Sequence, residues 1–297
     1  MQSAWWLLRL SLLVVLFLVC FVIGSLPVAG VLPDGAASEP GPVPPGIGLL
    51  IIALVNVLVI AALILTSRWG GWKLAISLAL AYYGAVTVLP QIETWYFLST
   101  ISVDRRLLPW LFVMGIPTAF LFVPLAVRLL GKWRAGRDAS PDRALGLPAG
   151  QWIGRLAVLA VAYAALYWAA GYFIAWQNPE LRAFYGRPGD AVPFLTHTAD
   201  TFRREPGLFL LQLLRALLWV LCALPVILGS RVSPGWTALV VGLLFSAPQN
   251  VAHILPNPLM PLASVRMSHL LETASSTFVF GVLVVLLLHR DPVLRRH

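Results

Sequence analysis

Ionisable and amide side chains interrupt four of the most apolar stretches of this 297-residue chain. Two of the four, around Glu93 and Arg215, each carry one charged residue. The other two contain polar stripes at spacings of three and four residues, which place side chains on one helix face. A charge within hydrocarbon is unfavourable, so such residues usually face the interior of a bundle and often mark a functional site. The stripes consist of Ser246, Gln249, Asn250 and His253, and of Arg266, His269, Glu272, Thr273 and Ser276.

These residue types could support three kinds of chemistry. Two histidines and two carboxylates are a set that divalent metals accept, and His269 and Glu272 have the spacing of a Glu-x-x-His metal pair in reversed order. Without a metal, one Glu and one His can act as general acid and base while Arg215 or Arg266 holds an anionic group. The same pair could instead carry protons during transport. The candidate metal ligands are Glu93, His253, His269 and Glu272.

A purely structural interpretation of these residues remains open. Polar side chains also hold membrane helices together, and Glu93 or Glu272 could simply pair with Arg215. Residues near the ends of spans can lie among lipid headgroups at little energetic penalty. Only one His/Glu pair with metal-ligand spacing is present, so no cofactor is strongly implied and a divalent metal is the only candidate.

The composition restricts the class of protein. Hydrophobic residues make up 59% of the chain and charged residues only 11%, whereas soluble domains contain about 25% charged residues. These values exclude both a water-soluble globular enzyme and a disordered chain. Cys20 and Cys222 lie within apolar runs, where thiols usually serve as packing residues. The sequence contains no Walker-type, GxGxxG, GxSxG, HExxH or CxxC motif.

Eight stretches have the roughly 20 apolar residues that a membrane-spanning helix needs. The first exceeds the 7–15 residues typical of the apolar part of a signal peptide, so we expect a retained helix. Residues 177–206 are expected to form a long loop in which His197 is solvated. The sequence thus predicts an all-α, polytopic transmembrane bundle in a single membrane domain, residues 1–297, with helices at about 5–26, 46–66, 72–98, 107–130, 153–176, 207–229, 236–255 and 265–288.

The net charge of +9 gives the predicted orientation. Most Lys and Arg residues, including Lys132, Arg134 and Arg137, fall in segments on the same side of the membrane as the N-terminus. The positive-inside rule therefore places both termini in the cytoplasm. The excess positive charge is accounted for as an orientation signal, so nucleic acid is not expected as a partner.

The polar residues of four predicted helices then share one half of the membrane, the outer half. We expect a protein of the bacterial cytoplasmic (inner) membrane, in contact with the lipid bilayer, whose outward-facing polar pocket binds or transports a small amphipathic or lipid-like ligand. A membrane-embedded enzyme that uses metal or acid–base hydrolysis is the first alternative, and a non-catalytic assembly subunit is the second. The candidate ligand-binding or proton-carrying residues are Glu93, Arg215, Asn250, His253, Arg266, His269 and Glu272.

Overall fold

The structure, a computed structural model, describes residues 2–32, 38–98, 104–134 and 148–289. Helices make up 80% of the chain. The described residues contain no strand, and their only β-type pairing is an isolated antiparallel bridge between Ser67 and Ser230. An all-α fold is therefore confirmed.

Eight helical segments are long and apolar enough to cross a membrane, as the sequence predicts. The cytoplasmic placement of the termini stays a prediction. The observed ends lie close to the predicted ones, apart from a start at Ala149 rather than near residue 153. The eight segments are Trp5–Ala29, Pro45–Thr66, Gly71–Tyr96, Leu108–Leu129, Ala149–Ala175, Pro206–Gly229, Pro234–Ile254 and Ala263–Leu288.

Several of these segments consist of more than one helical element. The undivided helices are α1 (Gln2–Ala29), α2 (Pro45–Thr66), α10 (Pro206–Gly229) and α12 (Ala263–Leu288). The third and fourth segments are α3 (Gly71–Tyr83), η1 (Gly84–Val88) and α4 (Leu89–Tyr96), and then α5 (Leu108–Met114), η2 (Pro117–Phe122) and α6 (Val123–Leu129). The fifth is α7 (Ala149–Ala170) with η3 (Gly171–Ala175), and the seventh is α11 (Pro234–Asn250) with η4 (Val251–Ile254).

The first two π-helical turns lie beside prolines. Proline has no N–H and leaves the carbonyl four residues before it without its helical partner. Pro90 follows η1 by two residues, and Pro124 follows η2 by two residues. A wider turn gives the freed backbone groups new hydrogen-bond partners. In a membrane span these partners have to come from the chain itself, because lipid excludes water.

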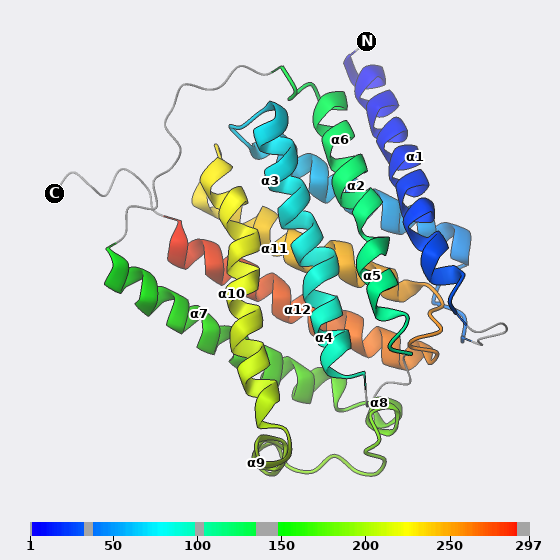
Figure 1. Cartoon of the computed structure of the whole chain (residues 1–297), viewed down its shortest axis with the longest axis vertical. Helices are drawn as coiled ribbons and strands as arrows, with labels where there is room; N and C mark the ends of the chain where they lie inside the picture. Colours follow the sequence, from blue (N-terminus) through cyan, green and yellow to red (C-terminus); the bar gives the residue numbers. More distant parts are fainter. Residues whose placement is uncertain (1, 33–37, 99–103, 135–147, 290–297) are drawn as a thin grey trace.

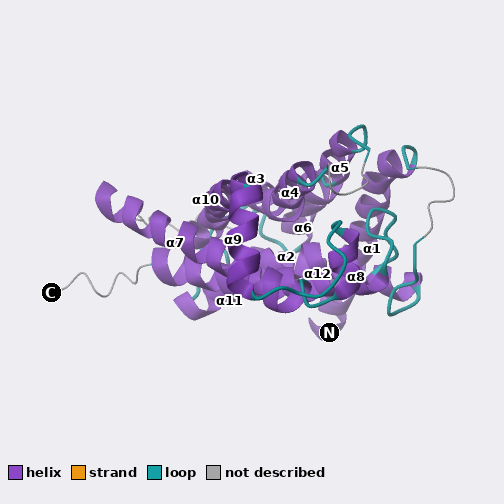
Figure 2. Cartoon of the chain, turned by 90° about the horizontal axis from the view of Figure 1, so that it is seen from below, coloured by secondary structure: helices purple, strands orange, loops and turns teal. Residues whose placement is uncertain are grey.

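Residues 177–206 are not a plain loop. They contain two short helices, α8 (Pro179–Phe184) and α9 (Phe194–Arg204). Helix α8 begins with a strong local signal, since the side chain of Asn178 accepts a hydrogen bond from the backbone N–H of Glu180 and Pro179 occupies the first turn. Both helices lie at one end of the bundle, called the α8–α9 end below (Figure 1), and Figure 2 looks directly onto it.

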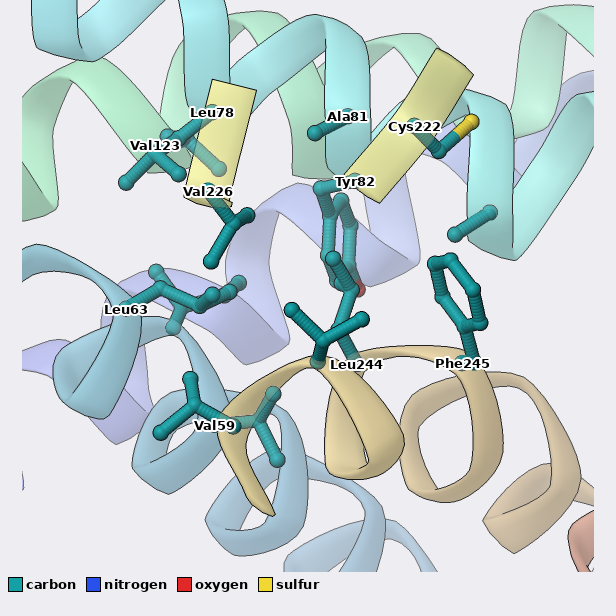
Figure 3. Packing of buried hydrophobic residues seen from close by; sticks show 14 of the residues in the cluster. Val59, Leu63, Leu78, Ala81, Tyr82, Val123, Cys222, Val226, Leu244 and Phe245 are labelled. Atoms are coloured by element: carbon teal, nitrogen blue, oxygen red, sulfur yellow. The ribbon is translucent and has the colours of Figure 1, made fainter. Parts of the chain in front are cut away.

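The core lies where α2, α3, α10 and α11 pack together (Figure 3). Val59, Leu63, Tyr82, Val226 and Leu244 are among the buried side chains that meet there. A polar connection joins α2 to α3 within this core: the Tyr82 hydroxyl donates to Oδ1 of Asn56, whose amide nitrogen donates to the Ile52 carbonyl of its own helix. The one strongly polar residue of the second span thus links two helices with its oxygen and satisfies its nitrogen within α2.

Helices α11 and α12 are held at unusually short range by two glycines. A Cβ atom added to Gly281 would lie 2.8 Å from the Cα atom of Gly242, so no side chain fits at this crossing. His253 follows Gly242 by about as many residues as separate His269 from Gly281. Since the two helices are antiparallel, equal separations bring both histidines to the same level, roughly 17 Å along each helix from the crossing.

Candidate functional site

A buried ion pair joins α4 to α10 near the α8–α9 end. The Nη2 atom of Arg215 lies 2.7 Å from Oε2 of Glu93. The Arg215 side chain is 4% exposed and the Glu93 side chain 28% exposed, so Glu93 is the more accessible partner. Nη1 of Arg215 also donates to Oε1 of Gln212, one turn earlier on the same helix, at 2.9 Å. The structural expectation that Glu93 could pair with Arg215 agrees with this geometry.

Some polar atoms beside the ion pair have no partner. Nε of Arg215 and Nε2 of Gln212 are both buried, and neither has a hydrogen-bond partner among the described residues. Oε1 of Gln91, two residues before Glu93, and Nε of Arg266, outside this region, are in the same condition. More than 90% of buried polar groups are normally paired. Unpaired donors on two adjoining side chains therefore indicate a place for water or for a polar group of a ligand.

Two tyrosines of α7 face the Arg215 guanidinium. The Cζ atom of Arg215 lies 5.9 Å from the ring centre of Tyr163 and 6.0 Å from that of Tyr167, within the range of cation–π attraction. The Tyr163 hydroxyl accepts a hydrogen bond from Nε1 of Trp219 at 3.1 Å, which fixes the orientation of its ring. Arg215 is thus held by one carboxylate, one amide and two aromatic faces.

A second group of polar residues forms a hydrogen-bonded chain across the start of α12. The Tyr185 hydroxyl lies 3.0 Å from Nε2 of His269, and Nδ1 of His269 lies 3.1 Å from Oε2 of Glu272. If Tyr185 donates to Nε2, the imidazole proton is on Nδ1 and is donated to the carboxylate. The three side chains therefore make a continuous donor–acceptor path.

The hydrogen-bonded chain of Tyr185, His269 and Glu272 and the Glu93–Arg215 ion pair together form one polar cluster. Burial is the main cause that raises the pKa of Tyr185 above its ordinary value, and the negative charges of Glu272 and Glu93 raise that pKa further. Tyr185 therefore stays protonated as a hydrogen-bond donor. The Tyr185 ring centre lies 6.0 Å from that of Phe97, which follows Glu93 by one helical turn, so the hydrogen-bonded chain and the ion pair are neighbours. We call Glu93, Arg215, Gln212, Tyr185, His269 and Glu272 the polar cluster.

The remaining residues of the α11 stripe are only partly directed at this cluster. The His253 ring centre lies 6.4 Å from that of His269. The amide nitrogens of Gln249 and Asn250 donate to carbonyls of their own helix, Phe245 and Ser246. A polar side chain that bonds four residues back along its own helix satisfies itself without a ligand.

The four candidate metal ligands do not form a metal site. Within residues 2–32, 38–98, 104–134 and 148–289, no three or more His, Cys, Asp and Glu side chains are grouped so that they could hold an ion. Glu93 is paired with Arg215, and Glu272 is paired with His269. This pairing gives the metal interpretation no geometric support.

Arg266 lies outside the polar cluster and joins two connecting segments. It is fully buried, and its two terminal nitrogens donate to five oxygens of these segments at distances of 2.7 to 3.2 Å. Oε2 of Glu39 accepts in turn from the backbone N–H of Ala263 at 2.7 Å. The five acceptors are the Ser38 hydroxyl and the carbonyls of Glu39, Pro40, Met260 and Pro261. With its terminal donors occupied in this way, Arg266 serves to fix the connections.

An aromatic-lined cavity of about 410 Å³ lies beside the end of α4, close in sequence to Glu93. Its lining residues come from the last turn of α4, the residues after it, and the start of α5. They are Trp95, Tyr96, Leu98, Arg105 and Leu108. The lining combines apolar rings with one positive charge, which suits an amphipathic molecule.

Sequence reasoning missed several members of this region. Tyr185 was part of an expected loop, and Gln212, Tyr163 and Tyr167 lie in apolar segments without a polar periodicity. The one available signal was the spacing of Gln212 and Arg215, which is three residues and places both on one helix face. The sequence predicts a solvated His197, but its ring packs against those of Trp168, Tyr172 and Trp176 at centre distances of 5.8, 5.4 and 5.0 Å.

Comparison with known proteins gives no relative: no family model, no curated protein and no solved structure matches this chain.

Proposed function

We propose that this membrane protein binds, and moves across or within the bilayer, a small amphipathic or lipid-like molecule with an anionic headgroup. The headgroup binds at Arg215. The observation that carries the proposal is the chemical type of the unpaired atoms at this position. Nε of Arg215 and Nε2 of Gln212 are both N–H donors, and both are buried and unpaired among the described side chains. Two unpaired donors on adjoining residues complement a carboxylate, phosphate or sulfonate.

A cavity beside the end of α4, the helix that carries Glu93, has a lining that suits the apolar part of such a ligand. Trp95 and Tyr96 line the cavity of about 410 Å³ and lie within one turn of Glu93. Aromatic and aliphatic walls with a few polar groups are the usual lining of a small-molecule site. In this proposal the apolar tail occupies the cavity while the anionic head reaches the guanidinium. Arg266 also has a buried, unpaired Nε, but no second unpaired donor adjoins it among the described side chains, and its terminal nitrogens are occupied by backbone carbonyls, so we assign it a structural role.

The orientation and membrane are part of the proposal. The distribution of Lys and Arg supports termini in the cytoplasm of a bacterial cell, with the α8–α9 end facing outward. The polar cluster then opens toward the extracytoplasmic side.

A second candidate function is acid–base catalysis within the membrane. The chain of Tyr185, His269 and Glu272 favours it, since a histidine oriented by a carboxylate and hydrogen-bonded to a hydroxyl is a general acid–base arrangement. Under this alternative a substrate bound at Arg215 would be cleaved rather than released intact. Recovery of the added ligand after incubation distinguishes the two functions.

Thermal unfolding in a nonionic detergent tests the binding proposal. Decanesulfonate and decyltrimethylammonium have the same apolar chain and opposite headgroup charges. We expect decanesulfonate to raise the unfolding temperature of the wild-type protein and decyltrimethylammonium to leave it unchanged. The shift should disappear in Arg215→Gln and persist in Arg203→Gln, a matched control whose side chain is 79% exposed.

Gln212→Leu keeps the Glu93–Arg215 ion pair and removes one unpaired donor, together with the Oε1 acceptor of Arg215 Nη1, so it tests the site while both charges of the pair remain. A hydrogen bond to a charged group contributes about 1.5–3 kcal/mol, so affinity for decanesulfonate should fall roughly tenfold or more. Equal stabilisation by both amphiphiles, or an unchanged shift in both Arg215→Gln and Gln212→Leu, would overturn the proposal.

A further inference from the structure

An anion bound at the unpaired Nε of Arg215 and Nε2 of Gln212 shares one guanidinium charge with Glu93. The guanidinium is already paired with the Glu93 carboxylate at 2.7 Å, and a ligand headgroup would compete for the same positive charge. The following inference rests on the proposed function, because it concerns what happens to Glu93 when the ligand binds.

Arg215 is the only permanently charged cation paired with Glu93 among the described residues. The titratable and charged groups on this side of the bundle are Arg215 of α10, Tyr163 and Tyr167 of α7, His269 and Glu272 of α12 and Tyr185 after α8. His269 is paired with Glu272 rather than with Glu93, and Glu272 adds a second negative charge. A carboxylate that loses its counter-charge in a low-dielectric interior becomes neutral by taking up a proton.

We propose that the anionic ligand binds together with one proton, and that Glu93 is the group that accepts this proton. The ligand headgroup binds at Nε of Arg215 and Nε2 of Gln212 and takes over the guanidinium charge, and Glu93 becomes a neutral carboxylic acid. One negative charge and one positive charge enter the site, so its net charge is unchanged. No covalent bond to the ligand forms or breaks, and water supplies the proton.

The hydrogen-bonded chain at the start of α12 supplies a route for this proton. Tyr185 lies in the segment after α8, at the α8–α9 end, and the chain runs from its hydroxyl through His269 to Glu272. His269 takes up a proton at Nε2 and releases the one on Nδ1 to the Glu272 carboxylate, which passes it on.

Calorimetric titration with decanesulfonate at one pH, in two buffers of different ionisation enthalpy, measures the protons taken up on binding. A sulfonate stays charged at every pH used, so any proton taken up belongs to the protein. We expect close to one proton per ligand in the wild-type protein. Glu93→Gln is already neutral, so it should bind decanesulfonate without taking up a proton.

The pH dependence of the wild-type protein gives the same answer without a variant. Linkage requires the affinity for decanesulfonate to fall roughly tenfold per pH unit at pH values where Glu93 in the free protein is ionised. This measurement decides the matter if Glu93→Gln does not fold. Binding without proton uptake, and with no dependence on pH, overturns this inference and leaves the proposed function standing. Absence of any decanesulfonate binding overturns both.

The route has its own readout. A pH-indicator dye in a stopped-flow instrument follows proton uptake after mixing with decanesulfonate. We expect His269→Phe to slow uptake at least tenfold with an unchanged number of protons. His253→Phe is the matched control, since His253 lies beside His269 but outside the hydrogen-bonded chain, and should react at the wild-type rate. Equal rates in the two variants would overturn the route.

Discussion

Nη2 of Arg215 and Oε2 of Glu93 are 2.7 Å apart, although the two residues belong to separate spans. This ion pair is the only contact in which a charged side chain of α10 meets a charged side chain of another described span. It lies at the centre of the polar cluster and joins α4 to α10.

Removing one partner of the pair should destabilise the protein more than removing both. Loss of one charge from a buried pair leaves the other uncompensated, and Glu93→Leu or Arg215→Met should each lower the free energy of unfolding by about 3 kcal/mol. The double variant Glu93→Leu/Arg215→Met should recover most of this loss, because apolar replacement of a buried pair is often neutral. Denaturation in mixed micelles measures the coupling, and additive single effects would contradict a direct pair.

Arg266 should matter for folding and not for ligand binding. Arg266→Met removes the donors that hold five oxygens of two connecting segments, so we expect a loss of about 3–5 kcal/mol in the free energy of unfolding. Protease cleavage near residues 38–40 and 256–262 should become faster. The folded fraction should still bind decanesulfonate with wild-type affinity. If affinity falls while the two connecting segments stay resistant to protease, Arg266 takes part in ligand binding and this prediction is wrong.

The close crossing of α11 and α12 should not tolerate a methyl group. A Cβ atom at Gly281 would lie 2.8 Å from the Gly242 backbone, so Gly281→Ala should cost about 1–3 kcal/mol through separation of the helices. The His253–His269 distance should also increase. Gly235→Ala, where an added Cβ meets nothing within 4 Å, is the control and should leave the unfolding temperature unchanged.

The packing of α9 should weaken in acid. The pKa of His197 is lowered, first by burial and then by the positive charge of Arg187, while Asp200 opposes this shift. A histidine whose pKa is lower in the folded protein than in the unfolded chain binds a proton more readily once the protein unfolds. Its contribution to stability is therefore complete above its ordinary pKa of about 6.5 and is lost as the pH falls toward the folded value.

Tryptophan fluorescence measures this effect, since Trp168 and Trp176 contact the His197 ring. Between pH 7 and pH 5 we expect the emission to shift as α9 detaches from α7. The shift should be absent in His197→Phe, which keeps an aromatic ring without a titrating nitrogen. A change of equal size in this variant would show that another group titrates.

The sequence predicts most of the fold because hydrocarbon imposes a simple length and composition rule. Eight apolar runs of about 20 residues translate directly into eight spans. The same rule says nothing about short segments outside the membrane, so α8 and α9 were missed although Asn178 and Pro179 are ordinary helix-start residues.

Prediction of the polar cluster was less complete. The three-residue spacing of His269 and Glu272 predicts their contact. The similar predicted depths of Glu93 and Arg215 in the membrane are compatible with the ion pair that they form. The roles of Tyr185 and Arg266 depend on the positions of connecting segments, which no helical periodicity encodes. In the sequence, a buried arginine that binds backbone carbonyls, such as Arg266, cannot be told from one that pairs with a carboxylate, such as Arg215.

The Nε–H group of Arg215 offers the most direct test of the central claim. In ¹⁵N-labelled protein in nanodiscs, its resonance can be assigned by its absence from Arg215→Lys. We predict a downfield shift of this proton on addition of decanesulfonate, since the unpaired donor gains an anionic acceptor, and no shift with decyltrimethylammonium. An Arg215 Nε–H signal that stays unchanged while decanesulfonate binds would contradict the account.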